Sequence, residues 1–266
     1  MLKDITIGQY YPAKSIIHSL DARVKLIATF IFMTSIFIVD NFSHYLLVLI
    51  FLVSVIKSSN IPSKFIFKGL KPLRFIILFT FIINVFFIPG ETIWSFGFLS
   101  VTKEGLSQAT FMSVRLLFLV IGTSILTLTT SPMDLTDGIE KLFEKFKKIG
   151  VPVHELAMMM TIALRFIPTL LDETDKIMKA QMSRGADLES KNLMERAKSL
   201  IPILVPLFIN AFKRADELSV AMEARCYRGG LNRTKMKISV ITKEDKISFG
   251  ILFIYLAIIL FMRFYI

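Results

Sequence analysis

The sequence predicts an all-α protein that crosses a membrane several times, and three observations support this prediction. The chain of 266 residues is 54% hydrophobic and contains 25 phenylalanines, and its mean hydropathy is +0.63. Several apolar runs approach the roughly 20 residues that a helix needs to cross a bilayer core of about 30 Å. Basic residues gather in particular loops, as they do on the cytoplasmic side of membrane proteins. We therefore expect about five transmembrane helices and a large cytoplasmic helical region.

Five apolar runs are the expected membrane spans. They cover residues 24–39, 45–56, 73–89, 111–130 and 247–264. Two further apolar segments, 156–171 and 200–212, are shorter and contain prolines. Each continues directly into a charged amphipathic stretch. We expect them to lie at the cytoplasmic face or to dip into the membrane, although hydropathy alone would make them a sixth and a seventh span.

The distribution of basic residues sets the expected orientation. The loop 57–74 contains lysines and an arginine but no acidic residue, whereas the loop 40–44 contains no lysine or arginine. The first loop therefore belongs in the cytoplasm and the second outside. We expect an N-terminus inside and a C-terminus outside. The expected parts are residues 1–130 with the first four spans, a cytoplasmic region at 131–246, and the last span at 247–266.

Composition also excludes several classes of protein. The net charge of +11 is explained by the cytoplasmic bias of basic residues, and acidic residues interleave the charged helices, so we expect no nucleic-acid partner. The single cysteine, Cys226, rules out an internal disulfide. His18, His44 and His154 are far apart in sequence, so no metal site built from histidines is expected. The chain has no GxxxxGK[ST] motif and therefore no phosphate-binding loop of its own.

The region 131–246 is expected to contain three helices. The first follows Ser131-Pro132 and ends at Gly150, since proline suits the first helical position and glycine the position after the last. The second covers 154–188 and is expected to be bent or broken at Pro168. The third runs from near Arg196 to about Tyr227. The second and third helices share an apolar first half, a charged second half and a final A-x-x-[SA]-R.

Two arginines, Arg184 and Arg225, therefore end two similar helices. An arginine on an amphipathic helix usually belongs to a solvated face, and Arg184 has Asp187 within reach as a surface partner. Arg225 has no local carboxylate. Its guanidinium is set among small and apolar residues, which suits insertion into an acidic pocket of a partner, where it can bind a carboxylate through two hydrogen bonds. Two such ends indicate two similar partners, or the two halves of one dimeric partner.

The motifs, taken in order, resemble a known family. "SIIHSLDARVKL" at 15–26, "TSPMDLTDGIEKL", "ALRFIPTLLDE", "AQMSRGAD" and "AMEARCYRGG" follow one another along the chain. They are similar to signatures of the transmembrane T component of energy-coupling factor (ECF) transporters, including the related cobalt and nickel versions. The resemblance covers nearly the whole chain. Ala22 stands where the family has a proline.

The resemblance implies a mechanical role in a prokaryotic cell membrane. Each arginine-ended helix would dock on one of two ABC-type ATPases, and both helices would lie beneath a separate substrate-binding membrane subunit, the S component. The docking motifs fall on Ser183-Arg184-Gly185 and Ala224-Arg225-Cys226, with Ser183 replacing the usual alanine and Cys226 the usual glycine. ATP would be bound by the partners, so the chain itself would need no cofactor and would not be an enzyme. The cargo would be a vitamin or another micronutrient.

Two smaller groups of residues are also candidates for function. Pro168, Pro202 and Pro206 are expected to be places where the long helices bend, although prolines that shape a fixed helix are the commoner case. A polar cluster, His18, Asp21, Arg23 and Lys25, precedes the first span. It has two interpretations, positioning of the cytoplasmic region or anchoring at the membrane interface by its basic residues.

Three alternatives remain beside the shared vitamin-type module. One is a dedicated cobalt or nickel uptake subunit of the same family, because the sequence does not name the substrate. Another is an ordinary ABC importer permease, which would carry one cytoplasmic coupling loop and more polar residues within its spans. An intramembrane enzyme would need acidic pairs, a serine with a base or clustered histidines at membrane depth, and the spans contain none of these.

Overall fold

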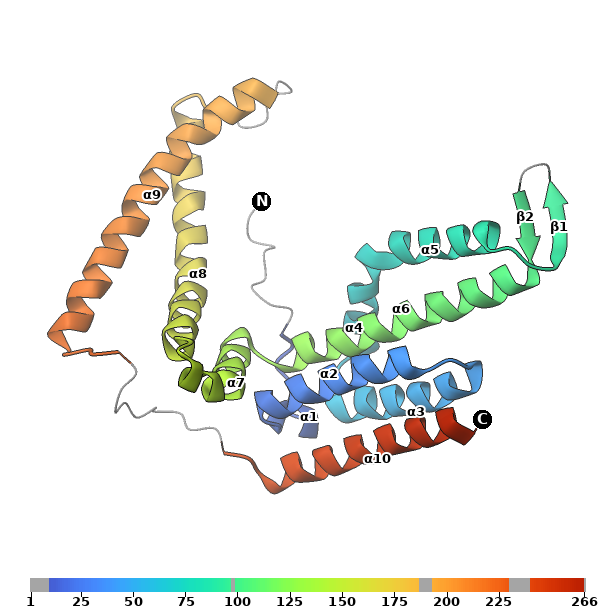
Figure 1. The fold of residues 1–266 in the computed structure, drawn as a ribbon. Helices are drawn as coiled ribbons and strands as arrows, with labels where there is room; N and C mark the ends of the chain where they lie inside the picture. Colours follow the sequence, from blue (N-terminus) through green and yellow to red (C-terminus); the bar gives the residue numbers. More distant parts are fainter. Residues whose placement is uncertain (1–9, 97–98, 187–192, 230–239, 266) are drawn as a thin grey trace. The chain divides into compact units, whose positions relative to one another are not determined.

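The computed structural model describes residues 10–96, 99–186, 193–229 and 240–265. Its described part is almost entirely helical, which confirms the predicted fold class. The chain divides into two units. We call Gly8–Gly138 together with Ile238–Ile266 the bundle unit, and Ile139–Lys237 the long-helix unit. Figure 1 shows the helices of both units along the chain.

The bundle unit is built from apolar helices. They are α1 (Ile16–Ser19), α2 (Ala22–Ile38), α3 (Phe42–Ser59), α4 (Ser63–Leu70), a 3₁₀ turn at Lys71–Leu73, α5 (Arg74–Phe87), α6 (Lys103–Thr129) and α10 (Lys243–Tyr265). α6 packs against α2, α3 and α5, and α10 packs against α2 and α3. The core includes Phe32, Ile36, Val48 and Ile259. The outer faces of α5 and α10 expose many large apolar side chains, as expected of helices surrounded by lipid.

Within the described residues, five helical segments are long and apolar enough to cross a membrane. They are Phe42–Ser59, Ser63–Phe87, Lys103–Thr129, Val153–Ser183 and Lys243–Phe264. Four of them contain expected spans. The expected span 24–39 forms α2, whose 17 residues are shorter than the other four. Val153–Ser183 includes the segment 156–171, so length and composition do not separate it from the spans. Its placement at the cytoplasmic face stays a prediction.

A small β-hairpin interrupts the helices of the bundle unit. β1 (Thr92–Phe96) pairs antiparallel with β2 (Leu99–Thr102), and Trp94 lies opposite Val101. It lies between the expected spans 73–89 and 111–130. The hairpin leads directly into α6, because the Thr102 hydroxyl accepts a hydrogen bond from the Gly105 backbone and caps the helix.

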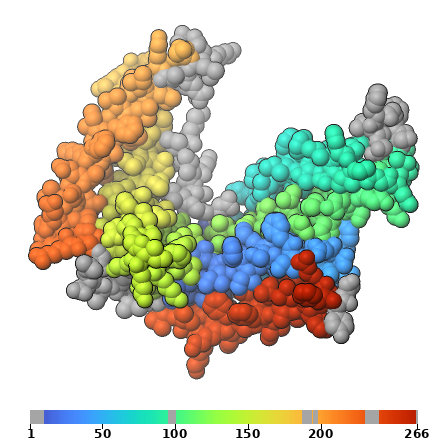
Figure 2. Space-filling view, in the orientation of Figure 1, coloured from blue at the N-terminus to red at the C-terminus, as the bar shows by residue number. Residues whose placement is uncertain are grey.

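The long-helix unit consists mainly of two antiparallel helices. α7 (Pro132–Phe143), shared with the bundle unit, continues as a 3₁₀ helix at Glu144–Ile149 and ends at Gly150, whose φ is +88°. The predicted start and end of this helix are confirmed. α8 (Val153–Ser183) and α9 (Leu193–Ala224) follow. Figure 2 shows α9, in orange, lying against α8, in yellow.

α8 is continuous through Pro168, so the predicted break at this residue is wrong. A proline inside a helix removes one backbone hydrogen bond, but the residues around it can keep helical geometry when tertiary packing holds them. Packing of α8 on α9 supplies that support here. The helix ends at Ser183 rather than at 188; residues 187 and 188 lie outside the described part of the chain.

Candidate docking site at the two arginine-ended helices

The end of α8 is a compact hydrogen-bonded motif centred on Arg184. Arg184 is the first residue after the helix, and Gly185 follows with a left-handed φ of +88°. The Gly185 N–H donates to the carbonyl of Met182, and the Ala186 N–H donates to the carbonyl of Gln181, both at 3.0 Å. These two bonds define a Schellman motif, which satisfies carbonyls that the helix end leaves free.

The end of α9 repeats the same motif residue by residue. Arg225 follows the helix, and Cys226 takes the left-handed position with a φ of +54°. The Cys226 N–H donates to Glu223 at 2.8 Å, and the Tyr227 N–H donates to Met222 at 3.0 Å. The sequence shows the shared A-x-x-[SA]-R pattern, but only the backbone geometry shows that both arginines occupy the same position of one motif.

Both guanidinium groups are presented to the surroundings. Arg184 and Arg225 are exposed, and neither side chain forms a hydrogen bond or ion pair with any residue that the structure describes. Asp187, the surface partner that the sequence offers to Arg184, lies outside the described residues. Ser183, Gly185, Ala224 and Cys226 are exposed as well. The small neighbours therefore leave each arginine accessible to a large partner.

Side-chain bonds between α8 and α9 fix their antiparallel register. The Gln181 side chain on α8 donates to the backbone carbonyl of Pro202 at 3.4 Å. Farther along, the Glu173 carboxylate accepts a hydrogen bond from Asn210 at 2.7 Å and lies 3.5 Å from the Arg214 guanidinium. Because the helices run in opposite directions, Arg184 and Arg225 end up at opposite ends of the pair (Figure 1).

The Gln181 contact follows from the prolines of α9. Pro206 has no N–H, so it cannot donate to the carbonyl of Pro202 four residues earlier. Gln181 supplies the missing donor from the neighbouring helix. Pro202 and Pro206, like Pro168, lie inside a continuous helix. A role of the three prolines as hinges stays a prediction.

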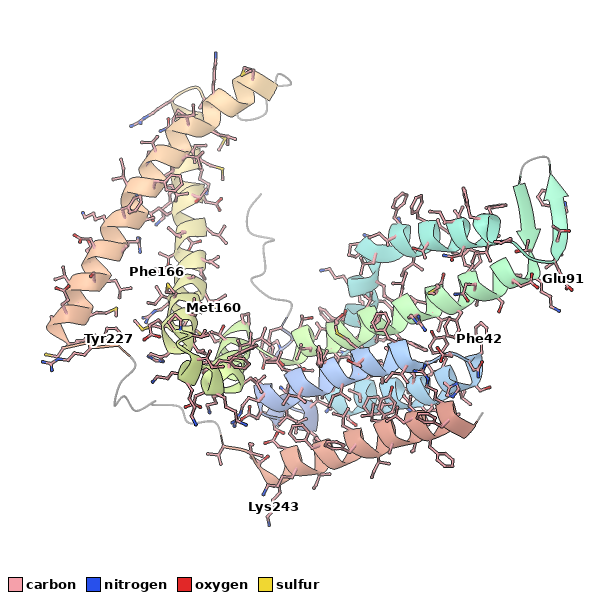
Figure 3. All side chains as sticks on the ribbon, viewed as in Figure 1. Phe42, Glu91, Met160, Phe166, Tyr227 and Lys243 are labelled. Atoms are coloured by element: carbon pink, nitrogen blue, oxygen red, sulfur yellow. The ribbon has the colours of Figure 1, made fainter. Side chains whose placement is uncertain are left out.

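A groove of about 460 Å³ lies between α8 and α9, next to the Arg225 end. α8 contributes Ile162, Phe166 and Leu170 to its lining, and Met222 and Tyr227 come from the Arg225 motif itself. Figure 3 labels Phe166 and Tyr227 on this part of the unit. The sequence does not reveal the groove, because its residues are 65 positions apart at the extremes and meet only through the antiparallel pairing.

The polar cluster of the bundle unit is a network at the start of α2. Asp21 caps α2 through the Arg23 N–H and also binds the Arg23 guanidinium at 2.8 Å. The buried Lys25 ammonium donates to the carbonyls of His18 and Thr129 at 3.1 and 3.0 Å. His18 in turn contacts the Ser15 hydroxyl and the Tyr11 carbonyl. The four residues come together as the sequence suggests, and Lys25 is held inside the protein rather than at its surface.

Asp245, which the sequence does not single out, also belongs to this network. Its buried carboxylate accepts hydrogen bonds from the Asp21 N–H at 2.9 Å and from the Thr242 N–H at 2.7 Å. The network thus joins the beginnings of α2 and α10, more than 200 residues apart. The available signal was Thr242-x-x-Asp245 before an apolar run, a pattern typical of a helix start.

Comparisons with known proteins agree along the full length of the chain. A family model described as "Cobalt transport protein" matches residues 13–238. The chain is 56% identical over 264 residues to the energy-coupling factor transporter transmembrane protein EcfT of Ruminiclostridium cellulolyticum, covering 99% of both chains. It is 57% identical to the protein of that name in Thermosediminibacter oceani, over 93% of this chain and 94% of the other. The Bacillus subtilis protein of that name is 47% identical over 99% of this chain and its entire length.

Proposed function

The chain belongs to the family of energy-coupling factor transporter transmembrane proteins, and on this basis we propose that α8 and α9 are its coupling helices. As a T component, the chain is a transmembrane part of a transporter rather than a catalytic subunit. The proposal assigns Arg184 and Arg225 to the contacts with two ABC-type ATPases. Those ATPases hydrolyse ATP, since this sequence has no GxxxxGK[ST] motif.

One observation carries the proposal: a single antiparallel helix pair ends twice in the same motif with an exposed arginine. A surface charge with no function has no reason to recur at the same backbone position. Arginine suits recognition of a carboxylate in a partner's pocket, because its planar group forms two parallel hydrogen bonds. Equal motifs at opposite ends fit two similar partners, one at each end.

The mechanism that we propose is mechanical. ATP binding brings the two ATPases together, and the arginine ends move with them. α8 and α9 pass this movement to a substrate-binding membrane S component, which releases its cargo inside the cell. We place residues 131–246 and the N-terminus in the cytoplasm and the C-terminus outside. Vitamins or other micronutrients are the proposed cargo, and the names of the relatives favour an energy-coupling factor transporter over an ordinary importer permease.

Co-purification in detergent tests this function. The wild-type chain and the variants Arg184→Glu, Arg225→Glu and the double variant are expressed with their two candidate ATPases. Each single reversal is expected to weaken ATPase retention, and the double reversal to abolish it. Lys176→Glu and Lys213→Glu are matched controls, because both lysines are exposed on the same helices and the charge change is identical.

The controls are expected to retain the ATPases at the wild-type level. Retention by the double variant would remove both arginines from the interface. Loss of binding in the two lysine controls would show that any charge reversal on α8 or α9 is disruptive, and the arginines would then have no special role.

A further inference from the structure

A second cavity lies inside the bundle unit. Its volume is about 460 Å³, and its walls come from α1, α2, α3, α6 and α10. Most of the lining is apolar, with Phe32, Phe51 and Leu252 among its residues. Cavities of this size and composition are typical of sites for small molecules. Lys25 of the polar cluster lines one end of it, and the residues of the predicted docking ends do not line it.

The walls of this cavity are held open by aromatic packing. The rings of Phe51 and Tyr255 stack with centroids 4.2 Å apart, and Phe32 lies 6.0 Å from Phe51. Phe32 also rests against Gly122, where even a methyl group would lie 2.3 Å from its ring. These contacts fix the positions of the Phe32 and Phe51 rings that line the cavity.

Polar lining residues gather at one end of the cavity. α2 and α10 begin at this end and contribute Lys25, Glu244 and Ser248, while α3 ends there and contributes Ser54 and Ser58. The apolar lining continues from there toward the middle of the bundle. Figure 3 labels Lys243 at this end of the bundle unit and Phe42 at the other. The cavity thus has a polar mouth and an apolar interior. This lining suits an amphiphilic ligand, which has a polar head and an apolar tail.

Exposed lysines adjoin the polar mouth. Lys57 precedes Ser58, and Lys243 and Lys246 flank Glu244 on α10. Lys14 lies close by, since its carbonyl accepts a hydrogen bond from Asn60 at the end of α3. Against these four cations stand the Glu244 carboxylate, which already accepts a hydrogen bond from Ser19, and the buried Asp245 carboxylate, which accepts hydrogen bonds from two backbone N–H groups. Excess positive charge at a membrane surface attracts anionic lipids.

We propose that the cavity binds one anionic phospholipid. One acyl chain occupies the apolar interior, and the phosphate-bearing headgroup lies at the mouth beside the lysines. The cavity opens among helices that the bilayer surrounds, where lipid tails are the abundant apolar groups. The bound lipid fills the space between α2, α3 and α10 and thereby stabilises the bundle unit.

Native mass spectrometry tests the proposal directly. The full chain, alone and in its transporter complex, is reconstituted in nanodiscs with equal amounts of phosphatidylglycerol and phosphatidylcholine and then released. The wild type is expected to retain one phosphatidylglycerol. Ala28→Trp and Ser54→Trp each place a bulky ring in the cavity and are expected to bind the lipid more weakly. If the ring excludes only two methylene groups of the acyl chain, the affinity for the lipid falls about tenfold. Phe30→Trp, on the exposed face of α2, is the matched control and is expected to retain the lipid.

Two results would overturn the proposal. One is a wild-type chain that retains no lipid. The other is equal retention of lipid in the wild type and the two cavity variants, and if both variants also lose a co-purifying membrane subunit, the cavity is a protein contact. The double variant Lys57→Gln/Lys246→Gln tests whether the lysines at the mouth bind the lipid headgroup. The double variant Lys145→Gln/Lys147→Gln, which removes two exposed lysines elsewhere, is its control. Equal preference for phosphatidylglycerol in both pairs would overturn the headgroup assignment.

Discussion

Gly185 and Cys226 occupy the same left-handed position in two copies of one helix-ending motif. Each donates its N–H to the carbonyl three residues earlier, and each directly follows an exposed arginine. The left-handed conformation costs a residue with a side chain roughly 1–2 kcal/mol, whereas glycine adopts it freely. The end of α9 therefore bears a strain that the end of α8 avoids.

The strain at Cys226 predicts opposite effects of two substitutions. Cys226→Gly is expected to stabilise the protein by about 1 kcal/mol, and Gly185→Ala to destabilise it by about as much. Thermal unfolding in detergent, followed by circular dichroism, measures both. Ala224→Gly, at the last residue of α9, is the control and is expected to destabilise the protein, since glycine lowers helix stability. A lower melting temperature for Cys226→Gly would show that the thiol itself is needed.

The contact between Glu173 and Asn210 predicts an energetic coupling across the helix pair. Glu173→Ala leaves Asn210 without its acceptor and removes the ion-pair partner of Arg214, and it is expected to cost about 1–2 kcal/mol. A double-mutant cycle of Glu173→Ala with Asn210→Ala is expected to give a coupling of about 1 kcal/mol. Asp172→Ala, exposed next to Glu173, is the control with an expected effect within about 0.5 kcal/mol. Strict additivity in the cycle would show that the hydrogen bond contributes nothing.

Lys25 predicts a strong requirement for a buried cation at the start of α2. Lys25→Met is expected to destabilise the protein by about 2–3 kcal/mol, because it leaves the carbonyls of His18 and Thr129 without their donor. Lys243→Met, on an exposed site of α10, is the control and should change stability little. The melting temperature in detergent and the yield of monodisperse protein report the difference. Equal melting temperatures and yields for Lys25→Met and Lys243→Met would mean that Lys25 acts only as an anchor at the membrane interface.

If the arginines bind carboxylates through two hydrogen bonds, lysine will not replace them fully. Arg184→Lys and Arg225→Lys keep the charge but lose the planar group, and each is expected to weaken ATPase binding about tenfold. Arg184→Gln and Arg225→Gln should weaken it further. Affinities for the ATPases measured at low and high salt separate the contribution of the positive charge from that of the planar guanidinium group. Lysine variants that bind as tightly as the wild type would mean that charge alone mediates the contact.

Local patterns in the sequence predict both ends of the helix that follows Ser131. Ser131-Pro132 and Gly150 bound the predicted helix because the Ser131 hydroxyl caps the Asp134 N–H and Gly150 accepts a left-handed φ. These rules act over a few residues, so the printed sequence contains all of the information. The small hairpin at Thr92–Thr102 was missed, because strand pairing depends on partners and not on local preference.

Local sequence patterns do not predict the contacts between residues far apart in the chain. Asp245 meets Asp21 across more than 200 residues, and the groove beside Arg225 forms only when α8 and α9 lie antiparallel. The prolines are the clearest example. Pro168 is predicted to bend or break its helix, yet α8 continues through it, and Pro206 frees a carbonyl to which Gln181 of α8 donates a hydrogen bond. In both cases a neighbouring helix compensates for a local defect that the sequence alone makes visible.

The side-chain bonds along α8 and α9 have a geometric consequence for anything bound at both ends. Sliding one helix along the other would break the bonds of Gln181 and Glu173, so the register resists it. The same bonds place Arg225 opposite Met158 of α8, and at about 1.5 Å per residue the two arginines are roughly 40 Å apart along the helix pair. If one binding partner holds each arginine end and the two partners approach each other, the distance between the arginines cannot shorten. The helix pair must tilt instead, so the linear approach of the partners becomes a rotation of α8 and α9.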